Sequence, residues 1–131
     1  MIWYWHTLEG ETLPEGIKPK VVFYTEVTGK KVIDLEIGAL TQTDTAKVLR
    51  AIYRLEDYGT SLPRRYARHI RDKIWELKED RYRILYFTFV KNKFVVLRVF
   101  MKKTERTPES EIRIAEKRML DYRVRHADEL T

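Results

Sequence analysis

The sequence contains no cysteine among its 131 residues. Disulfides, thiolate metal ligands and a cysteine nucleophile are therefore excluded. No stretch approaches the roughly 20 consecutive apolar residues that a membrane-spanning helix requires. The N-terminus lacks a basic region, and Glu9 and Glu11 interrupt its short apolar start, which is not typical of a signal peptide. We therefore expect a cytoplasmic protein that makes no contact with a membrane.

Glycine and proline are also scarce, at 5 and 4 residues, and no internal repeat is visible. The chain is 44% hydrophobic and 12% aromatic, which is typical of a protein with a packed core, and its length fits one domain. Residues 1–19 are aromatic and rich in turn-forming residues. We expect them to form an N-terminal extension of a single domain at 20–131. The aromatic residues Trp3, Tyr4 and Trp5 are predicted to cover a sheet edge.

Positive charge is concentrated in one part of the chain. The net charge is +6, and residues 62–106 hold 14 Lys and Arg against 5 Asp and Glu. A basic segment of this kind favours an anionic partner such as a nucleic acid. With 3 histidines and no cysteine, nothing in the sequence indicates a metal site or a cofactor, and we expect neither.

Residue patterns predict the strands and helices. β-branched and aromatic residues favour strands at 20–27, 74–78, 82–89 and 94–101. Helical spacing predicts a short helix within 31–40 and a longer one that begins at Thr43 or Asp44 and ends before Gly59. One helical turn is expected at 64–70.

A last helix is predicted to begin at Thr107, with the threonine as its N-cap and Pro108 in its first position. The order strand, helix, helix, three strands, helix indicates an α+β fold, with helices packed on one face of a mostly antiparallel sheet. In the strand at 74–78, Trp75 and Leu77 alternate with Glu76 and Lys78. We assign Trp75 to the core and expect the charged face to be open and functional.

Four short motifs follow one another along the chain: Trp75-Glu76-Leu77, then residues 82–87 (YRILYF), then 100–104 (FMKKT), then Thr107-Pro108-Glu109 with an isoleucine at 112. In this order and spacing they resemble the phage-derived branch of the RelE/HigB toxin family, over about residues 21–122. The resemblance implies a RelE-like fold with a C-terminal helix.

The resemblance also implies a function. The chain would be the toxin component of a type II toxin–antitoxin system, and a ribosome-dependent, metal-independent mRNA endonuclease (an mRNA interferase) that inhibits translation. Its partners would be mRNA on the ribosome and a cognate antitoxin, a helix-turn-helix protein similar to HigA, in a hetero-oligomer. Two alternatives stay open: a non-catalytic toxin that binds DNA gyrase, as ParE-like relatives do, or an RNA- or ribosome-binding module. The aromatic N-terminus could also stack on a base or contact the antitoxin.

Cleavage of RNA by its own 2′-OH needs a base, cations for the phosphate and an acid for the leaving oxygen. Arg83 matches the family arginine and is the predicted catalytic stabiliser of the phosphate. The predicted RNA-binding residues are all basic: Lys78, Arg81, Arg98, Lys102 and Lys103.

The sequence departs from the best understood RelE pattern, because Ile74 and Glu76 stand where that branch has lysines. Glu76 is then a candidate proton acceptor, and Tyr82 or Tyr86 a candidate donor or stacking platform. Structural roles are the alternatives: Arg83 could pair with Glu76, the tyrosines could belong to the core, and the lysines could be solvated. His69 is expected to be an ordinary surface residue.

Overall fold

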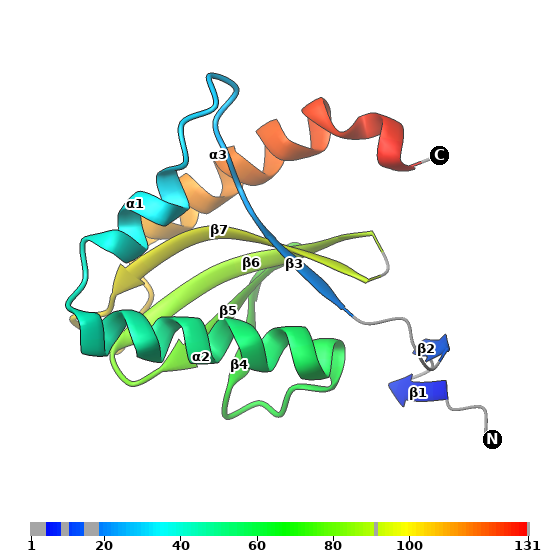
Figure 1. Ribbon diagram of the computed structural model, residues 1–131, viewed down its shortest axis with the longest axis horizontal. Coiled ribbons are helices and arrows are strands. Elements are labelled where there is room, and N and C mark those ends of the chain that lie inside the picture. The colour runs from blue at the N-terminus through cyan, green and yellow to red at the C-terminus, as the bar shows by residue number, and fades with distance from the viewer. Residues whose placement is uncertain (1–4, 9–10, 15–18, 91, 131) are drawn as a thin grey trace.

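A computed structural model describes residues 5–8, 11–14, 19–90 and 92–130, with side chains from residue 19 onward (Figure 1). The strands are β1 (Trp5–Leu8), β2 (Glu11–Pro14), β3 (Lys20–Phe23), β4 (Ala67–Arg71), β5 (Ile74–Glu79), β6 (Tyr82–Val90) and β7 (Lys93–Met101). The helices are α1 (Val32–Gly38), α2 (Gln42–Tyr58) and α3 (Glu109–Arg125). The predicted helices and the long hairpin are therefore confirmed.

Five strands form the main sheet, in the order β3-β7-β6-β5-β4. The pairs β4–β5, β5–β6 and β6–β7 are antiparallel, whereas β3 runs parallel to β7, with Val21 opposite Phe94. The α+β class and the mostly antiparallel sheet are confirmed. The ends of β5 and β7 and the start of β6 lie at the same end of this sheet, because these strands alternate in direction.

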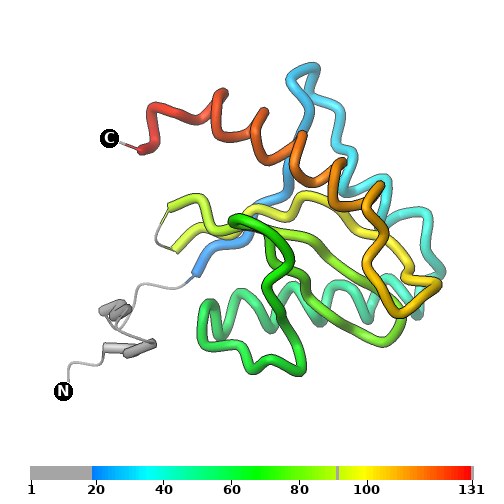
Figure 2. Tube along the Cα trace, turned by 180° about the vertical axis from the view of Figure 1, so that it is seen from behind, coloured from blue at the N-terminus to red at the C-terminus, as the bar shows by residue number. Residues whose placement is uncertain are grey.

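The long helices lie on opposite faces of the sheet (Figures 1 and 2). Tyr82 of β6 donates a hydrogen bond to Asp44 of α2 at 2.6 Å, whereas the Phe87 ring contacts Tyr122 of α3. These two β6 residues are five positions apart, and successive strand residues point to opposite faces. Helices therefore cover both faces of the sheet and not one face as expected, because α3 packs on part of the face that the sequence left open.

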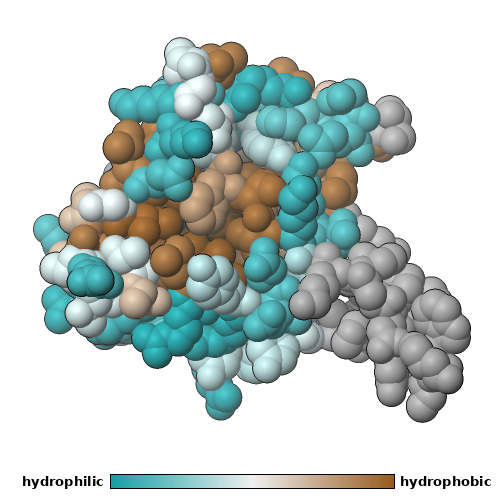
Figure 3. Space-filling view, in the orientation of Figure 1, coloured by the Kyte–Doolittle hydropathy of each residue, from teal (hydrophilic) through white to brown (hydrophobic). Residues whose placement is uncertain are grey.

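Each long helix buries one stripe of its own residues against the sheet. The buried residues of α2 are Val48, Ala51, Ile52 and Leu55, and those of α3 are Ile112, Ala115, Met119 and Tyr122. Figure 3 shows that apolar surface gathers between α1 and α2, with hydrophilic side chains around it.

The ends of the helices differ from the prediction in two places. The N-cap of α2 is Thr41, whose hydroxyl accepts the Asp44 N–H at 3.1 Å, and not Thr43 or Asp44. Thr107 does not cap α3, because Pro108 holds the N-cap position and the Thr107 hydroxyl donates to the Glu76 carboxylate. Gly59 ends α2 as predicted, at a positive φ of 55° that favours glycine.

Two predictions at strands were wrong. Residues 67–71 form edge strand β4 rather than part of a helical turn, because pairing with β5 places Arg68 opposite Glu76. Two residues of β5 also differ from the prediction: Trp75 is 39% exposed and Glu76 is fully buried, whereas Leu77, on the same face as Trp75, is buried. The cause is tertiary, since Arg68 and Thr107 enclose the Glu76 carboxylate, while α2 ends at Tyr58 and leaves Trp75 partly open.

The strands β1 and β2 pair with each other in an antiparallel hairpin. The prediction that Trp3, Tyr4 and Trp5 cover a sheet edge concerns side chains outside the described residues, and the boundary between 1–19 and 20–131 stays a prediction. None of the helices in the described residues is both long and apolar enough to cross a membrane.

Candidate functional site

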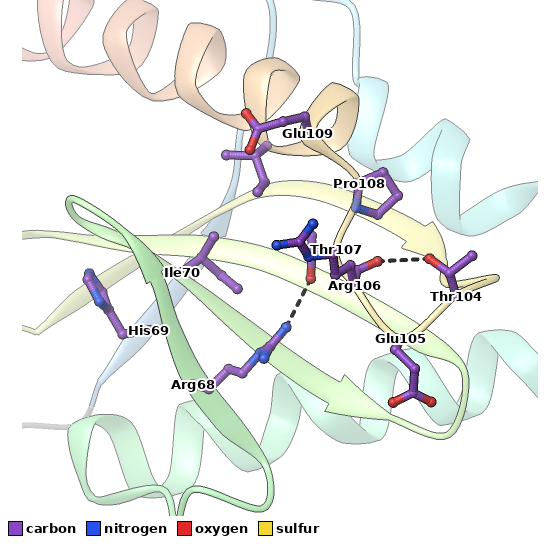
Figure 4. Close-up of a pocket in the computed structure, with 10 residues that line it drawn as sticks. Arg68, His69, Ile70, Thr104, Glu105, Arg106, Thr107, Pro108 and Glu109 are labelled. Atoms are coloured by element: carbon purple, nitrogen blue, oxygen red, sulfur yellow. Dashed lines mark hydrogen bonds between the residues drawn. The ribbon is translucent and has the colours of Figure 1, made fainter.

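A cleft of about 620 Å³ opens between edge strand β4 and the loop that joins β7 to α3. Figure 4 shows the side chains around it. Its lining residues come from β4, from this loop and from the first turns of α3: Arg68, His69, Ile70, Thr104, Glu105, Arg106, Thr107, Pro108, Glu109 and Ile112. The cleft therefore lies on the same face of the sheet as α3, between β4 and the loop that follows β7.

The wall of the cleft is held by the carboxylate of Glu76. Its Oε1 accepts a hydrogen bond from Arg68 Nε at 3.0 Å, and its Oε2 accepts one from the Thr107 hydroxyl at 2.5 Å. Arg68 also donates to the Thr107 hydroxyl oxygen at 3.2 Å. Because Glu76 is fully buried and both its oxygens are engaged, it fits a positioning role better than that of the predicted proton acceptor.

Arg83 lies on the other side of Glu76. Its Nε is 3.7 Å from Glu76 Oε1, which is an ion pair but too long for a hydrogen bond. This buried Nε has no hydrogen-bond partner among the described residues, while one terminal nitrogen donates to the carbonyls of Asp80 and Tyr82. Unpaired buried donors are rare and costly, and they are often found at functional sites.

Lys78 stands directly opposite Arg83 in the pairing of β5 with β6. Like charges at opposed positions of a sheet destabilise it. A bound anion would remove this repulsion. Neither Lys78 nor the exposed Lys103 makes an ion pair with any residue that the structure describes. Although Arg83 pairs with Glu76, Lys78 has no such partner there, and these opposed cations favour an anionic ligand.

Further cations stand at the same end of the sheet. The Lys102 N–H donates to the Arg81 carbonyl at 2.7 Å, which holds the end of β7 against the β5–β6 turn. The nearby acidic residues Glu79 and Asp80 are neutralised from the α2 side, by Arg54 and Lys47. We call Arg68, Lys78, Arg81, Arg83, Lys102 and Lys103 the cationic end of the sheet.

Tyr82 and Tyr86 lie on the opposite face from this group. Tyr82 is buried and donates its hydroxyl proton to Asp44, and the pKa of that carboxyl is lowered chiefly by this hydrogen bond. Tyr86 is buried too, and desolvation raises the pKa of its hydroxyl. The structure therefore does not bring either tyrosine together with Arg83.

Arg98 is also separate from the other predicted RNA-binding residues. Its guanidinium donates to Glu111 at 2.6 Å and to Glu36 at 2.7 Å. Because two carboxylates pair with it, Arg98 connects α1, β7 and α3 and is not free to bind a phosphate.

The predicted site residues did not include the cleft residues Arg68, Arg106 and Thr107. Arg68 was not predicted because residues 64–70 were expected to form a helical turn. A strand at these residues, paired with β5, would place Arg68 beside Glu76. His69 borders the cleft, but its ring packs on Trp75 at 5.4 Å between centroids. Since His69 pairs with Trp75 across β4 and β5, its side chain lies on the face away from Arg68.

The fold and the cleft define a class: a small α+β protein with a cleft and a group of basic residues beside one end of a mostly antiparallel sheet. The family described as "Phage derived protein Gp49-like (DUF891)" matches residues 35–120. The chain belongs to this family, which is a RelE-like toxin family, and the predicted resemblance is thereby confirmed. The matched residues include the whole of the cationic end.

Among solved structures, the chain is similar to one in the RelBE2 toxin–antitoxin complex from Mycobacterium tuberculosis. The identity is 19% and the TM-score 0.47, and the match covers 66% of this chain and 100% of the other. No curated protein matches the sequence.

Proposed function

We propose that this chain is the toxin component of a toxin–antitoxin system, and that it cleaves mRNA on the ribosome without a metal ion. The observation that carries the proposal is the cationic end of the sheet, where Lys78 and Arg83 oppose each other. The Glu76 carboxylate joins Arg83 to Arg68, which lines the open cleft. Membership of a RelE-like family supports it, since toxins of that type are generally ribonucleases.

In the proposed reaction, the 2′-oxygen of one nucleotide attacks the adjacent phosphorus and the bond from phosphorus to the 5′-oxygen breaks. The 2′-OH proton goes to a base, and the 5′-oxygen leaves with a proton from an acid. Negative charge grows on the phosphate oxygens, and Arg83, Lys78 and Arg68 supply the cations that stabilise it. Lys102, Lys103 and Arg81 bind the neighbouring phosphates.

Glu76 acts as a positioning residue in this proposal. Its carboxylate fixes Arg68 and Thr107 through hydrogen bonds, and its charge pairs with the Arg83 guanidinium 3.7 Å away. Guanidinium groups held in place before the reaction cost no reorganisation as charge develops.

The proposed partner is a separately encoded antitoxin of the helix-turn-helix, HigA-like type, in a cytoplasmic hetero-oligomer. The cationic end supports this part as well, because an exposed basic surface is complementary to an acidic protein partner.

The test is induced expression of the full chain in a bacterial host, with mapping of new 5′ ends in total RNA. We expect new ends within translated messages, and a fall of about 10²- to 10³-fold in cleavage with Arg83→Ala. The matched control is Arg50→Ala, which removes an exposed arginine from α2, and Tyr86→Phe should also keep full activity.

Two results would contradict the proposal. Growth arrest with intact messages would indicate a protein target such as gyrase instead. RNA cleavage that Arg83→Ala leaves unchanged would contradict the assignment of Arg83 to the catalytic site.

A further inference from the structure

The outer face of α3 exposes two aliphatic side chains. Leu120 is 62% exposed and Val124 69% exposed. With Arg113 and Lys117 they are spaced four, three and four residues apart, so the four side chains follow one face of the helix. This face is opposite to the stripe that is buried on the sheet. Figure 2 shows α3 in the foreground, with no other part of the chain in front of it.

The charges of α3 are divided between its faces. All four of its acidic residues make ion pairs inside the protein: Glu109 and Glu116 with Arg71, Glu111 with Arg98, and Asp121 with Arg125. Arg113, Lys117 and Arg123 make no ion pair with the residues that the structure describes. The outer face is therefore cationic and partly apolar.

A groove of about 440 Å³ runs beside this face, between α3 and the loop from β3 to α1. Val27 on the loop is 75% exposed, and Ile114 and Lys117 line the groove from the helix. The apolar surface thus continues from the helix into a depression that a second helix could fill.

We propose that the outer face of α3, made by Arg113, Lys117, Leu120 and Val124, docks an acidic amphipathic helix of a second polypeptide. Leucine and valine anchors at helical spacing fit the apolar stripe of such a helix. Acidic residues beside that stripe would complement the unpaired Arg113 and Lys117. An RNA is disfavoured, because aliphatic side chains contribute nothing to phosphate binding and this face has no exposed aromatic ring for a base.

This inference rests on the proposed function in one respect: the second polypeptide is the antitoxin. Leu120 and Val124 are 11 and 15 residues beyond Glu109 at the cleft. At a rise of about 1.5 Å per residue they lie roughly 17–22 Å along the helix from it. A polypeptide bound on this face can therefore leave the cleft open, or reach it by continuing along α3.

The test measures the affinity of the full chain for the polypeptide encoded by the reading frame adjacent to its gene, by isothermal titration calorimetry. We expect the double variant Leu120→Glu and Val124→Glu to weaken binding by at least about tenfold, and Lys117→Glu by several-fold. The matched control is Leu35→Glu, which places the same charge at a 58% exposed leucine of α1. It should leave the affinity within about twofold. Circular dichroism checks that every variant is folded.

Three results would overturn the inference. The first is an affinity that the double variant leaves unchanged. The second is that the wild-type chain forms a homodimer and the double variant is a monomer. The third is that the double variant loses binding to a single-stranded RNA oligonucleotide. Growth arrest and RNA cleavage by the chain alone report on the proposed function separately, and the double variant should keep both.

Discussion

Glu76 is a buried carboxylate that accepts hydrogen bonds from Arg68 and Thr107 and forms an ion pair with Arg83. Its removal leaves Arg83 partly buried with no carboxylate, and it releases the Thr107 hydroxyl. We expect Glu76→Ala to lower the free energy of unfolding by about 3 kcal/mol, as is typical when one partner of a buried ion pair is removed. Urea unfolding of the purified variant measures this change.

The control for Glu76 is Glu79→Ala, three residues further along the same strand and on its other face. Glu79 pairs with Arg54 where both side chains are closer to solvent, so the expected loss is about 1 kcal/mol or less. Equal losses of unfolding free energy in the two variants would show that burial does not increase the contribution of Glu76 to stability.

The same residue shows how far the sequence could predict the site. Arg83 and the basic residues around it could be proposed because their motifs lie close together in the chain. Glu76 was placed on the correct strand but on an open face, because alternation separates two faces without revealing which one other elements cover. Arg68 and Thr107, which enclose it, come from 8 and 31 positions away.

At the level of elements, α1 protects the free edge of β7. Beyond Val96, where pairing with β3 ends, the Val99 N–H donates to Glu36 at 2.9 Å and the Leu97 carbonyl accepts from Arg118 at 2.9 Å. Side chains therefore satisfy backbone groups that a further strand would otherwise take.

We expect Glu36→Ala to lower the free energy of unfolding by about 3 kcal/mol, because it strips a carboxylate from Arg98, Arg118 and the Val99 amide. Hydrogen exchange at the Val99 amide should become faster. Asp34→Ala is the control, since Asp34 is exposed in the first turn of α1 and contributes a few tenths of a kcal/mol, roughly, through the helix dipole. Unchanged exchange at Val99 would contradict the protective role.

The stability that the contact between α3 and the residue after β3 contributes should depend on pH. Hydrogen bonds from Arg125 and then Tyr24 hold the pKa of Asp121 below its ordinary value. A carboxyl whose pKa is lower in the folded state adds stability above the unfolded pKa of about 3.9, and this stability is lost as the pH falls through the folded pKa. We expect the difference in stability between wild type and Asp121→Asn to shrink between about pH 5 and pH 2, measured by thermal unfolding. A constant difference would mean that Asp121 does not titrate with folding.

Elements with strong periodicity were predicted well, and the exceptions have a common cause. The strands β6 and β7 and the buried stripe of α3 follow from apolar residues at regular spacing. Strand β4 reads Ala-Arg-His-Ile-Arg and carries no such pattern. It is a strand because β5 supplies its hydrogen-bonding partners, and that information lies outside its own residues.

For the whole molecule, the uneven charge predicts salt-dependent binding. The association constant for a single-stranded RNA oligonucleotide should fall as the salt concentration rises. A plot of its logarithm against the logarithm of the salt concentration should have a slope of about −0.7 for each phosphate neutralised. We expect Lys102→Ala and Lys103→Ala together to reduce the slope by about 1.4. Lys30→Ala, in the exposed loop between β3 and α1, is the control. Fluorescence anisotropy at several salt concentrations gives both slopes, and equal slopes would place the RNA elsewhere.

The parallel pairing of β3 with β7 has a consequence for the synthesis of the chain. Val21 pairs with Phe94, Tyr24 bonds to Asp121, and Thr25 accepts from Arg125. The first strand of the main sheet therefore gains its neighbours only when nearly the whole chain has left the exit tunnel. Contacts of such high sequence separation form late and slowly. A nascent chain halted before residue 93 lacks β7, so it carries an unpaired β3 and no completed cationic end.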